Sequence, residues 1–235
     1  MKIDILTILP NMFKNIFSES LIGKAINSKI LNITVIDIRS FSSDKHKKVD
    51  DKPFGGGSGM VIKVEPIYNA IRKLGVIKKN NTYRNPYLRP YVVCMSPQGK
   101  TLNNKIIKYI SKFKHLIIVC GHYEGIDERV VNYVDEEISI GDYVLTGGEI
   151  PAMVLVDTVA RMLPGVIKGK DSVQNDSFFN GLLDYPHYTR PSVFRGYVVP
   201  GVLLSGNHKK IEEWREKEAL KRTKERRPEL LKRRN

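Results

Sequence analysis

The sequence predicts an α/β fold with a parallel β-sheet, followed by a smaller, mostly helical C-terminal domain. Three observations lead to this prediction. Short apolar runs alternate with stretches of helical spacing, glycine-rich turns follow several of these runs, and the last thirty residues are strongly basic. Alternation of strands and helices is typical of a parallel sheet that helices cover on both faces.

The predicted strands and helices alternate from the first residues onward. The strands are the short, β-branched runs 2–9, 32–38, 91–97 and 115–121. The helices between them are predicted over 11–27, 64–74 and 101–113. Asp4 interrupts the first run and Pro10 follows it, which indicates a strand rather than a signal peptide. The polar segment 77–90 contains two prolines, so an exposed loop is expected there.

The later part of the chain predicts a buried helix, a linker and a basic domain. Residues 150–163 are apolar almost all round, with Pro151 in the first turn, which is typical of a buried helix. We therefore divide the chain into an α/β domain (1–164), a linker without periodicity (165–181) and a helical domain (182–235). Residues 206–235 hold twelve Lys and Arg against six Glu. If this stretch is a helix, it presents either a solvated face or a surface that binds RNA.

Charge and cysteine content narrow the class of protein. The 235-residue chain has a net charge of +14 and a pI near 9.7. Nucleic acid is the first partner to expect and an anionic membrane the second. The sequence contains no apolar run long enough to span a bilayer. Cys94 and Cys120 lie inside apolar runs, without metal-ligand spacing, which indicates a reducing, cytoplasmic environment.

The segment "PFGGGSGM" (53–60) has four glycines in five positions and suggests a phosphate cradle. Its spacing fits neither a P-loop nor a dinucleotide-binding turn, because Met60 stands where each motif needs another glycine. Glycine permits positive φ and close approach of another group to the backbone. Taken alone, the segment favours a flexible surface turn over a ligand-binding loop.

Glycine-marked turns also occur in "SPQGK" (96–100), "CGHYEGIDERV" (120–130) and "ISIGDYVLTGGEIP" (138–151). Ligands of open parallel sheets bind just beyond the carboxyl ends of the strands. We therefore expect one composite pocket, formed mainly by backbone, for an uncharged or zwitterionic ligand with an adenine-like ring. Lysine does not follow the glycines as in a P-loop, which weighs against nucleotide hydrolysis.

These turns, in this order and together with "DSFFNGLLDYPHYTRP" (176–191) and "VLLSGNHKKIEEWR" (202–215), resemble the bacterial tRNA (guanine37-N1)-methyltransferases of the SPOUT class. The resemblance extends from Met1 to about residue 231. It implies a parallel sheet whose C-terminal part forms a trefoil knot, S-adenosylmethionine as methyl donor, tRNA carrying G37 as substrate, and a homodimer with each active site built from both chains. Several family members need Mg²⁺.

The resemblance also assigns residues to the methyl donor. Those expected to line its pocket are Gly121, Ile140, Gly141, Asp142, Tyr143, Val144 and Leu145; those expected at its edge are Ser96, Gln98, Tyr123, Glu124, Gly147 and Gly148. For each glycine the alternative is a tight turn that the fold itself needs.

For the substrate, the resemblance places the loop 53–60 opposite the methyl donor and the target guanine. The residues assigned to this role are Asp51, Pro53, Gly55, Gly56, Gly57 and Gly59, and Arg190 is a candidate RNA contact. A rigid turn between two prolines explains the segment around Arg190 equally well.

Asp176 and Arg161 resemble the two catalytic residues of the family. N1 of guanine must lose a proton before it attacks a methyl group, and Asp176 would accept it. A free Asp has a pKa near ~4, so Arg161 would stabilise the charge that develops on guanine O6. The alternatives are a capping role for Asp176 and an ion pair between Arg161 and Asp157.

Two other functions stay open on sequence alone. Another SPOUT methyltransferase, acting on ribosomal RNA or on a ribose hydroxyl, would carry similar loops. A basic RNA-binding protein that has lost the chemistry would keep the fold and the charge.

Overall fold

The computed structural model describes residues 1–76, 85–167 and 176–232. Its contacts divide the chain into two compact units, Met1–Ile167 and Lys168–Asn235. Parts of the predicted loop 77–90 and linker 165–181 lie outside the described residues. Each unit is described by itself below.

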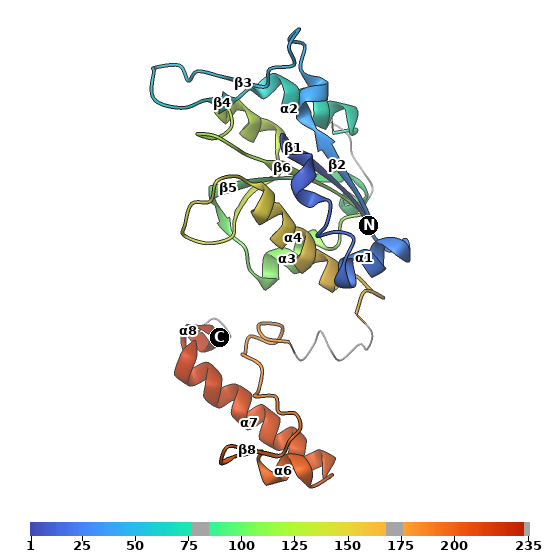
Figure 1. Cartoon of the computed structure of the whole chain (residues 1–235), viewed down its shortest axis with the longest axis vertical. Coiled ribbons are helices and arrows are strands. Elements are labelled where there is room, and N and C mark those ends of the chain that lie inside the picture. The colour runs from blue at the N-terminus through green and yellow to red at the C-terminus, as the bar shows by residue number, and fades with distance from the viewer. Residues whose placement is uncertain (77–84, 168–175, 233–235) are drawn as a thin grey trace. The chain divides into compact units, whose positions relative to one another are not determined.

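The first unit is built on a five-stranded parallel sheet (Figure 1). Its strands, in the spatial order β2-β1-β6-β5-β7, are β2 (Asn32–Asp37), β1 (Lys2–Thr7), β6 (His115–Cys120), β5 (Pro90–Thr101) and β7 (Glu136–Ser139). Each neighbouring pair is parallel. This confirms the predicted α/β fold with a parallel sheet. A small antiparallel pair, β3 (Asp50–Asp51) and β4 (Val61–Ile62), flanks the glycine-rich loop.

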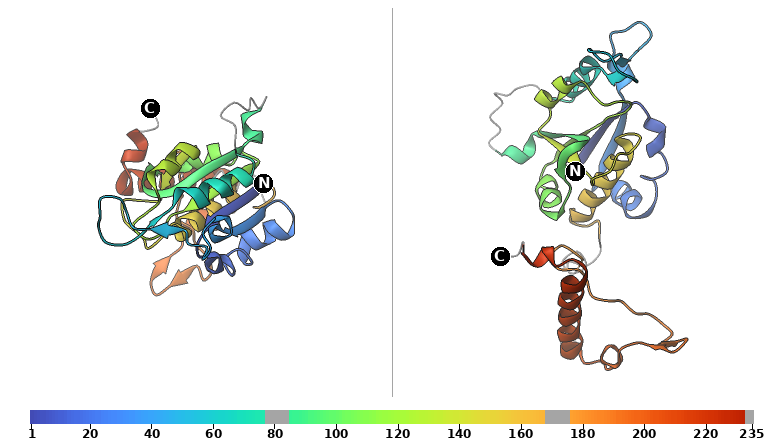
Figure 2. Two further views of the ribbon diagram at one scale, coloured as in Figure 1. Left: turned by 90° about the horizontal axis from the view of Figure 1, so that it is seen from above. Right: turned by 90° about the vertical axis from the view of Figure 1, so that its left-hand side faces the viewer.

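Helices cover both faces of this sheet (Figures 1 and 2). On β6, Leu116 and Ile118 pack in one cluster with α1 (Ser20–Asn27), α3 (Asn104–Ile110) and α4 (Glu149–Met162). The alternate residues Ile117 and Val119 pack in a second cluster with α2 (Val64–Lys73). Side chains of a strand alternate between faces, so the apolar run of β6 supplies both cores. Four 3₁₀ turns lie among these elements: η1 (Pro10–Phe13), η2 (Ile38–Phe41), η3 (Pro86–Leu88) and η4 (Glu128–Tyr133).

Two predicted helices are wrong in extent. The expected helix 11–27 is a 3₁₀ turn at Pro10–Phe13 followed by α1, and the chain between them is not helical. A positive φ of 59° at Ser20 interrupts the helical path there. The expected helix 101–113 begins only at Asn104, because β5 continues to Thr101 by pairing Lys100 and Thr101 with β7.

The strand β7 was missing from the predicted set. Its two glutamates, Glu136 and Glu137, hide the apolar pattern of a short strand. The structure explains how Glu136 is tolerated, because Lys100 forms an ion pair with it at 2.7 Å and the Tyr91 hydroxyl donates a hydrogen bond to it at 3.1 Å.

The predicted buried helix, α4, is buried on one side only. Ala152, Leu155, Val156 and Val159 are inaccessible, whereas Ile150 and Val154 are 46% and 38% exposed. The apolar composition of α4 therefore predicted more burial than the structure shows, because an apolar stripe remains at the surface of this single chain.

The second unit consists of a hairpin and helices. The hairpin strands are β8 (Val193–Phe194) and β9 (Tyr197–Val198), and the helices are α6 (Gly201–Leu204), α7 (His208–Arg226) and α8 (Glu229–Lys232). Asn207 caps α7 by accepting a hydrogen bond from Lys210 N at 3.1 Å. Buried Thr223 accepts one from Leu183 N at 2.9 Å, which fixes the segment after Asp176 to α7. Within the described ranges, no helix is long and apolar enough to cross a membrane.

Acid is expected to destabilise the first unit through Asp4. Burial alone would raise the pKa of this carboxyl, but hydrogen bonds from His115 and Lys2 outweigh it and hold the pKa below its usual value. The stabilisation is therefore present above the unfolded pKa of about 4 and is lost as the pH falls through the lower folded pKa. Asp4→Asn should lose about 1–3 kcal/mol at pH 7, and less at about pH 3. Denaturant unfolding at both pH values measures this, and an equal loss at both would contradict it.

Both cysteines are expected to resist thiol reagents while the protein is folded. Burial, with a smaller effect of Glu137, raises the pKa of Cys94 to about 12. Burial also raises the pKa of Cys120, which is 1% exposed. Since the thiolate is the reactive form, labelling should be slow in native buffer and complete for both cysteines after unfolding. Rapid labelling of native protein would contradict this arrangement.

Candidate functional site

A cavity of about 260 Å³ lies at the carboxyl ends of β5, β6 and β7. Residues from three segments, 94–98, 121–131 and 137–148, line it together with Pro151 of α4. The second and third contain glycine-marked turns that the sequence placed after strands. The expected turn 96–100 is instead part of β5, whose pairing with β7 shifts register between Met95 and Lys100. The composite pocket predicted at this edge of the sheet is therefore present.

Two of the turns are joined by backbone contacts. Gly148 N donates a hydrogen bond to Gly121 O at 2.7 Å, and Gly147 forms an antiparallel bridge with His122. A Cβ atom on Gly148 would lie 2.8 Å from Gly121 N and 2.9 Å from the Cα of Cys120. Only glycine permits this approach. Because β5 lies between β6 and β7 in the sheet, the chain after β7 passes the end of β5 to reach β6.

The turn after β7 forms one wall of the cavity. The Ser139 hydroxyl donates to Gly141 O at 2.9 Å and accepts from Gly141 N at 3.2 Å. Gly141 has a φ of +154°, and an added Cβ would lie 2.5 Å from the Tyr143 ring. The Tyr143 ring therefore packs directly on the Gly141 backbone, and Val144 and Leu145 follow it in the lining of the cavity.

The charged groups that line the cavity are acidic. They are Glu124, Asp127, Glu128 and Glu137, and no Lys or Arg belongs to the lining within the described residues. Hydrogen bonds from Arg129, the largest influence, keep the pKa of Asp127 below its usual value, so this carboxylate is charged at neutral pH. Such a lining disfavours phosphate groups and suits a ligand with positive charge.

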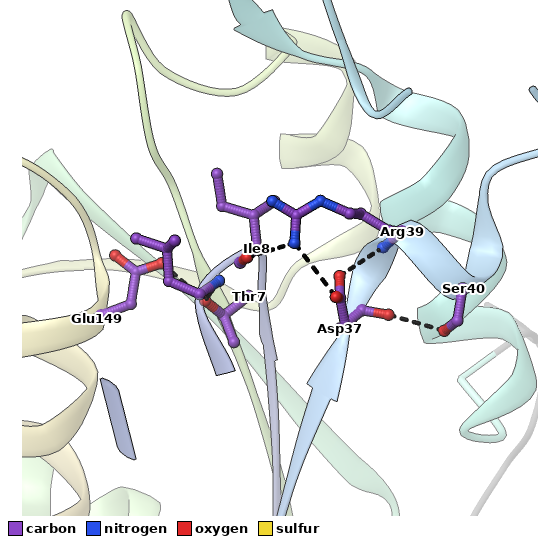
Figure 3. A network of polar contacts seen from close by, with 7 residues as sticks. Thr7, Ile8, Asp37, Arg39, Ser40 and Glu149 are labelled. Atoms are coloured by element: carbon purple, nitrogen blue, oxygen red, sulfur yellow. Dashed lines mark hydrogen bonds and ion pairs between the residues drawn. The ribbon is translucent and has the colours of Figure 1, made fainter. Parts of the chain in front are cut away.

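A buried carboxylate lies next to the cavity residue His122. Glu149, at the start of α4, is 1% exposed and accepts a hydrogen bond from the Thr7 hydroxyl at 2.7 Å (Figure 3). Its other oxygen lies 3.6 Å from Nδ1 of His122, a cavity residue. Figure 3 also shows Arg39 joining Ile8 O to Asp37, which fixes the ends of β1 and β2 next to this contact.

Comparison with known proteins decides the family. The family model "tRNA (Guanine-1)-methyltransferase TrmD" matches residues 1–233. The chain belongs to this family. It is 71% identical over 232 residues to a tRNA (guanine-N(1)-)-methyltransferase of Endomicrobium trichonymphae, covering 99% of this chain and 100% of that one. Enzymes of the same name from Ruminiclostridium cellulolyticum and Fervidobacterium nodosum are 50% and 54% identical, with 98% of this chain and 96% and 90% of theirs covered. The family resemblance inferred from the motifs is confirmed.

In this TrmD-family chain, the residues assigned to the methyl donor gather in one place. All of them except Asp142 line the cavity, and Asp142 lies exposed in the same turn. Their proximity was expected, whereas their roles stay predictions. The sequence did not single out His122 and Glu149, although both stand in the quoted motifs. A charged residue at the start of an apolar helix was the available signal for Glu149.

The glycine-rich loop does not line the cavity, but it is anchored to it. Glu124 N donates to Met60 O at 3.0 Å, and a Cβ on Gly59 would lie 2.4 Å from the Glu124 side chain. Gly55, Gly56 and Gly57 have positive φ, as expected for such a loop, and Phe54 is fully exposed. Asp51 and Pro53 stand at its start, outside the lining of the cavity.

The two residues assigned to catalysis are not brought together by one unit. Arg161 lies in the last turn of α4, whereas Pro151 of the first turn lines the cavity. Asp176 belongs to the second unit, where it lines a separate cavity of about 560 Å³ together with Asp184 and Arg215. Arg190 is exposed in the second unit. The roles assigned to these residues stay predictions.

Proposed function

We propose that this protein transfers the methyl group of S-adenosylmethionine to N1 of guanine 37 in tRNA. The observation that carries the proposal is the cavity at the ends of β5, β6 and β7, in a chain that belongs to the TrmD family over residues 1–233. The cavity supplies a site for the methyl donor, and the family supplies the tRNA (guanine-N1) chemistry.

S-adenosylmethionine fits the groups that line this cavity. Its sulfonium and ammonium are cationic, in accord with the four acidic side chains of the lining and with the lack of Lys and Arg among its described residues. Backbone groups of Gly121, Ile140 and Gly141, with the apolar side chains of Val144 and Leu145, suit an adenine ring. The donor supplies an electrophilic methyl group, and the protein has to hold it in line with the attacking nitrogen.

Asp176 and Arg161 would act on the guanine. In our proposal the Asp176 carboxylate accepts the N1 proton, the N1 electron pair attacks the methyl carbon, and the carbon–sulfur bond breaks to leave S-adenosylhomocysteine. The guanidinium of Arg161 stabilises negative charge on O6. The exposed loop 53–60, with Gly55 to Gly57 and Gly59 next to Glu124, would approach the base.

A homodimer would explain why Arg161 lies away from the cavity of its own chain. Ile150, Val154, Asp157 and Arg161 are spaced to share one helical face of α4, and the first two are apolar and exposed. We propose that this face meets a second copy, so that Arg161 of one protomer serves the cavity of the other.

The trefoil knot belongs to the same proposal. The contact between Gly148 and Gly121 joins the chain after β7 to the chain after β6, across the end of β5. A trefoil knot requires one segment of the chain to cross another in this way.

The second unit would hold the tRNA. It contains sixteen Lys and Arg against nine Asp and Glu, and Arg190 is one of its exposed cations. Phosphate contacts of this kind provide affinity that falls as salt rises. For Mg²⁺, the described residues contain no group of three or more His, Cys, Asp or Glu that could hold a metal ion. None of the reaction steps proposed above involves a metal ion.

The deciding experiment is methyl transfer from labelled S-adenosylmethionine to an unmodified tRNA transcript with G at position 37. We expect label on this transcript and none on a transcript with A at that position. Label that survives the G37→A change would overturn the target assignment and favour another RNA methyltransferase of the SPOUT class. Binding of tRNA and S-adenosylmethionine without any transfer would favour a non-catalytic RNA-binding protein.

A further inference from the structure

The buried Glu149 carboxylate has a polar neighbour at each of its two oxygens. Its Oε1 accepts the Thr7 hydroxyl at 2.7 Å, and that hydroxyl oxygen in turn accepts Leu9 N at 2.8 Å. The Leu9 N–H occupies a lone pair of the hydroxyl, so the hydroxyl hydrogen points at Glu149. The position in the first turn of the 14-residue helix α4 further favours a negative charge.

The second carboxylate oxygen faces a histidine that is incompletely satisfied. Oε2 lies 3.6 Å from Nδ1 of His122, which is too long for a hydrogen bond. This Nδ1 is buried and has no hydrogen-bond partner among the described residues. Leaving it so is costly. A small rotation of either side chain would close the gap, and a protonated Nδ1 is the form that a carboxylate attracts.

Gly147 makes this approach between the two side chains possible. A Cβ atom on Gly147 would lie 2.4 Å from Glu149 Oε2 and 2.5 Å from His122 Nδ1. Any other residue would separate them. The same glycine forms the backbone bridge to His122.

His122 connects the pair to the cavity. It lines the cavity, and its ring lies edge-on to that of Tyr123 with centroids 5.1 Å apart. Its side chain is 23% exposed, and since Nδ1 is buried this exposure belongs to other atoms of the side chain. With Nδ1 turned to Glu149, Nε2 is the ring nitrogen that can meet the contents of the cavity.

We propose that Glu149 is a positioning residue that holds His122 as the Nδ1–H tautomer and so presents Nε2 as a hydrogen-bond acceptor to the methyl donor. The part that concerns the methyl donor rests on the proposed function. The acceptor would receive an N–H or O–H of the donor molecule, and filling the cavity would close the contact between Glu149 and His122 to a hydrogen bond.

The test is the tautomer of His122, read from ¹⁵N chemical shifts of the full-length chain labelled at histidine. The spectrum is recorded at about pH 8, above the usual His pKa of ~6.5, and His122→Gln assigns the signal. We expect protonated Nδ1 and unprotonated Nε2 in the free chain, and the same form in the complex with S-adenosylhomocysteine. Protonated Nε2 in the wild-type chain would overturn the inference without any variant.

Two variants distinguish a positioning role of Glu149 from a purely structural one. Glu149→Gln keeps the shape and can still accept from Thr7, but it removes the charge that fixes the tautomer. We expect loss of the Nδ1–H preference and about tenfold weaker binding of S-adenosylhomocysteine, the size expected for one charge-assisted hydrogen bond. Thr7→Val removes the other hydrogen bond of Glu149 and should keep the tautomer. Identical tautomer shifts in both variants would indicate general loosening and contradict the proposal.

A double-mutant cycle gives an independent measurement. In a His122→Ala background, Glu149→Gln should change the Kd for S-adenosylhomocysteine by less than about twofold, because the group it positions is absent. An undiminished tenfold effect would contradict the proposal. A wild-type chain that shows the Nδ1–H tautomer but binds no S-adenosylhomocysteine would refute the proposed function and leave the Glu149–His122 pairing confirmed.

Discussion

Replacing Asp176 by Asn is expected to lower kcat for methyl transfer by about 10²–10⁴-fold, the usual contribution of a positioned general base. Asparagine keeps the size of the side chain but cannot take the N1 proton. Binding of S-adenosylmethionine should be unchanged, because the cavity proposed for it is lined by the first unit alone whereas Asp176 belongs to the second. Single-turnover kinetics with saturating tRNA, together with the Kd for the methyl donor, measure both quantities.

A matched control for this variant is Glu213→Gln, which removes one exposed acidic charge from α7 of the same unit. It should leave the single-turnover rate at saturating tRNA within about twofold of wild type, since surface changes away from a site have small effects. An Asp176→Asn variant with the rate of this control would remove Asp176 from the proposed mechanism.

The second large effect is expected for Gly148→Ala. The added Cβ would lie 2.8–2.9 Å from backbone atoms of Cys120, at the end of β6, and of Gly121, which follows it; backbone atoms cannot rotate away as the end of a side chain can. Either the hydrogen bond from Gly148 N to Gly121 O breaks or the start of α4 shifts. We expect an overpacking loss of about 1–3 kcal/mol in the free energy of unfolding. The Kd for S-adenosylmethionine should rise at least tenfold, because both joined turns line the cavity.

Gly201→Ala is the control for this prediction. Gly201 opens α6, has ordinary φ, and an added Cβ would meet no atom within 4 Å. The control should change stability by less than about 1 kcal/mol and leave methyl-donor binding intact. Denaturant unfolding and calorimetric titration measure the two variants side by side. Equal behaviour of Gly148→Ala and Gly201→Ala would show that the close approach has no part in binding.

Local patterns predicted some elements well and others poorly. The apolar runs of β1, β2 and β6 match the described strands closely, because β1 and β6 are buried on both faces and the apolar residues of β2 are partly buried. The helix 11–27 failed because a left-handed Ser20 stands in an otherwise helical pattern. The strand β7 escaped notice because two of its four residues are glutamates, and the partners of Glu136, Lys100 and Tyr91, are far away in the sequence.

At the candidate site, too, the sequence predicted some features and missed others. The sequence identified the turns that line the cavity, since glycine in a turn after a strand has a local signature. It did not reveal that Gly55 to Gly57 would lie outside the lining, or that Asp142, exposed in the turn after β7, would lie outside it too. These outcomes depend on the path of each loop, which nearby residues do not fix.

The sequence by itself determined the family, the parallel α/β fold and the three glycine-marked segments that line the cavity, because ordered motifs and strand periodicity are properties of neighbouring residues. Only the tertiary structure decided which turns touch. Thr7 and Glu149 are 142 positions apart, and Gly148 meets Gly121 across the end of another strand. Such contacts depend on how the sheet orders its strands, so they leave no periodic pattern in the residues that make them.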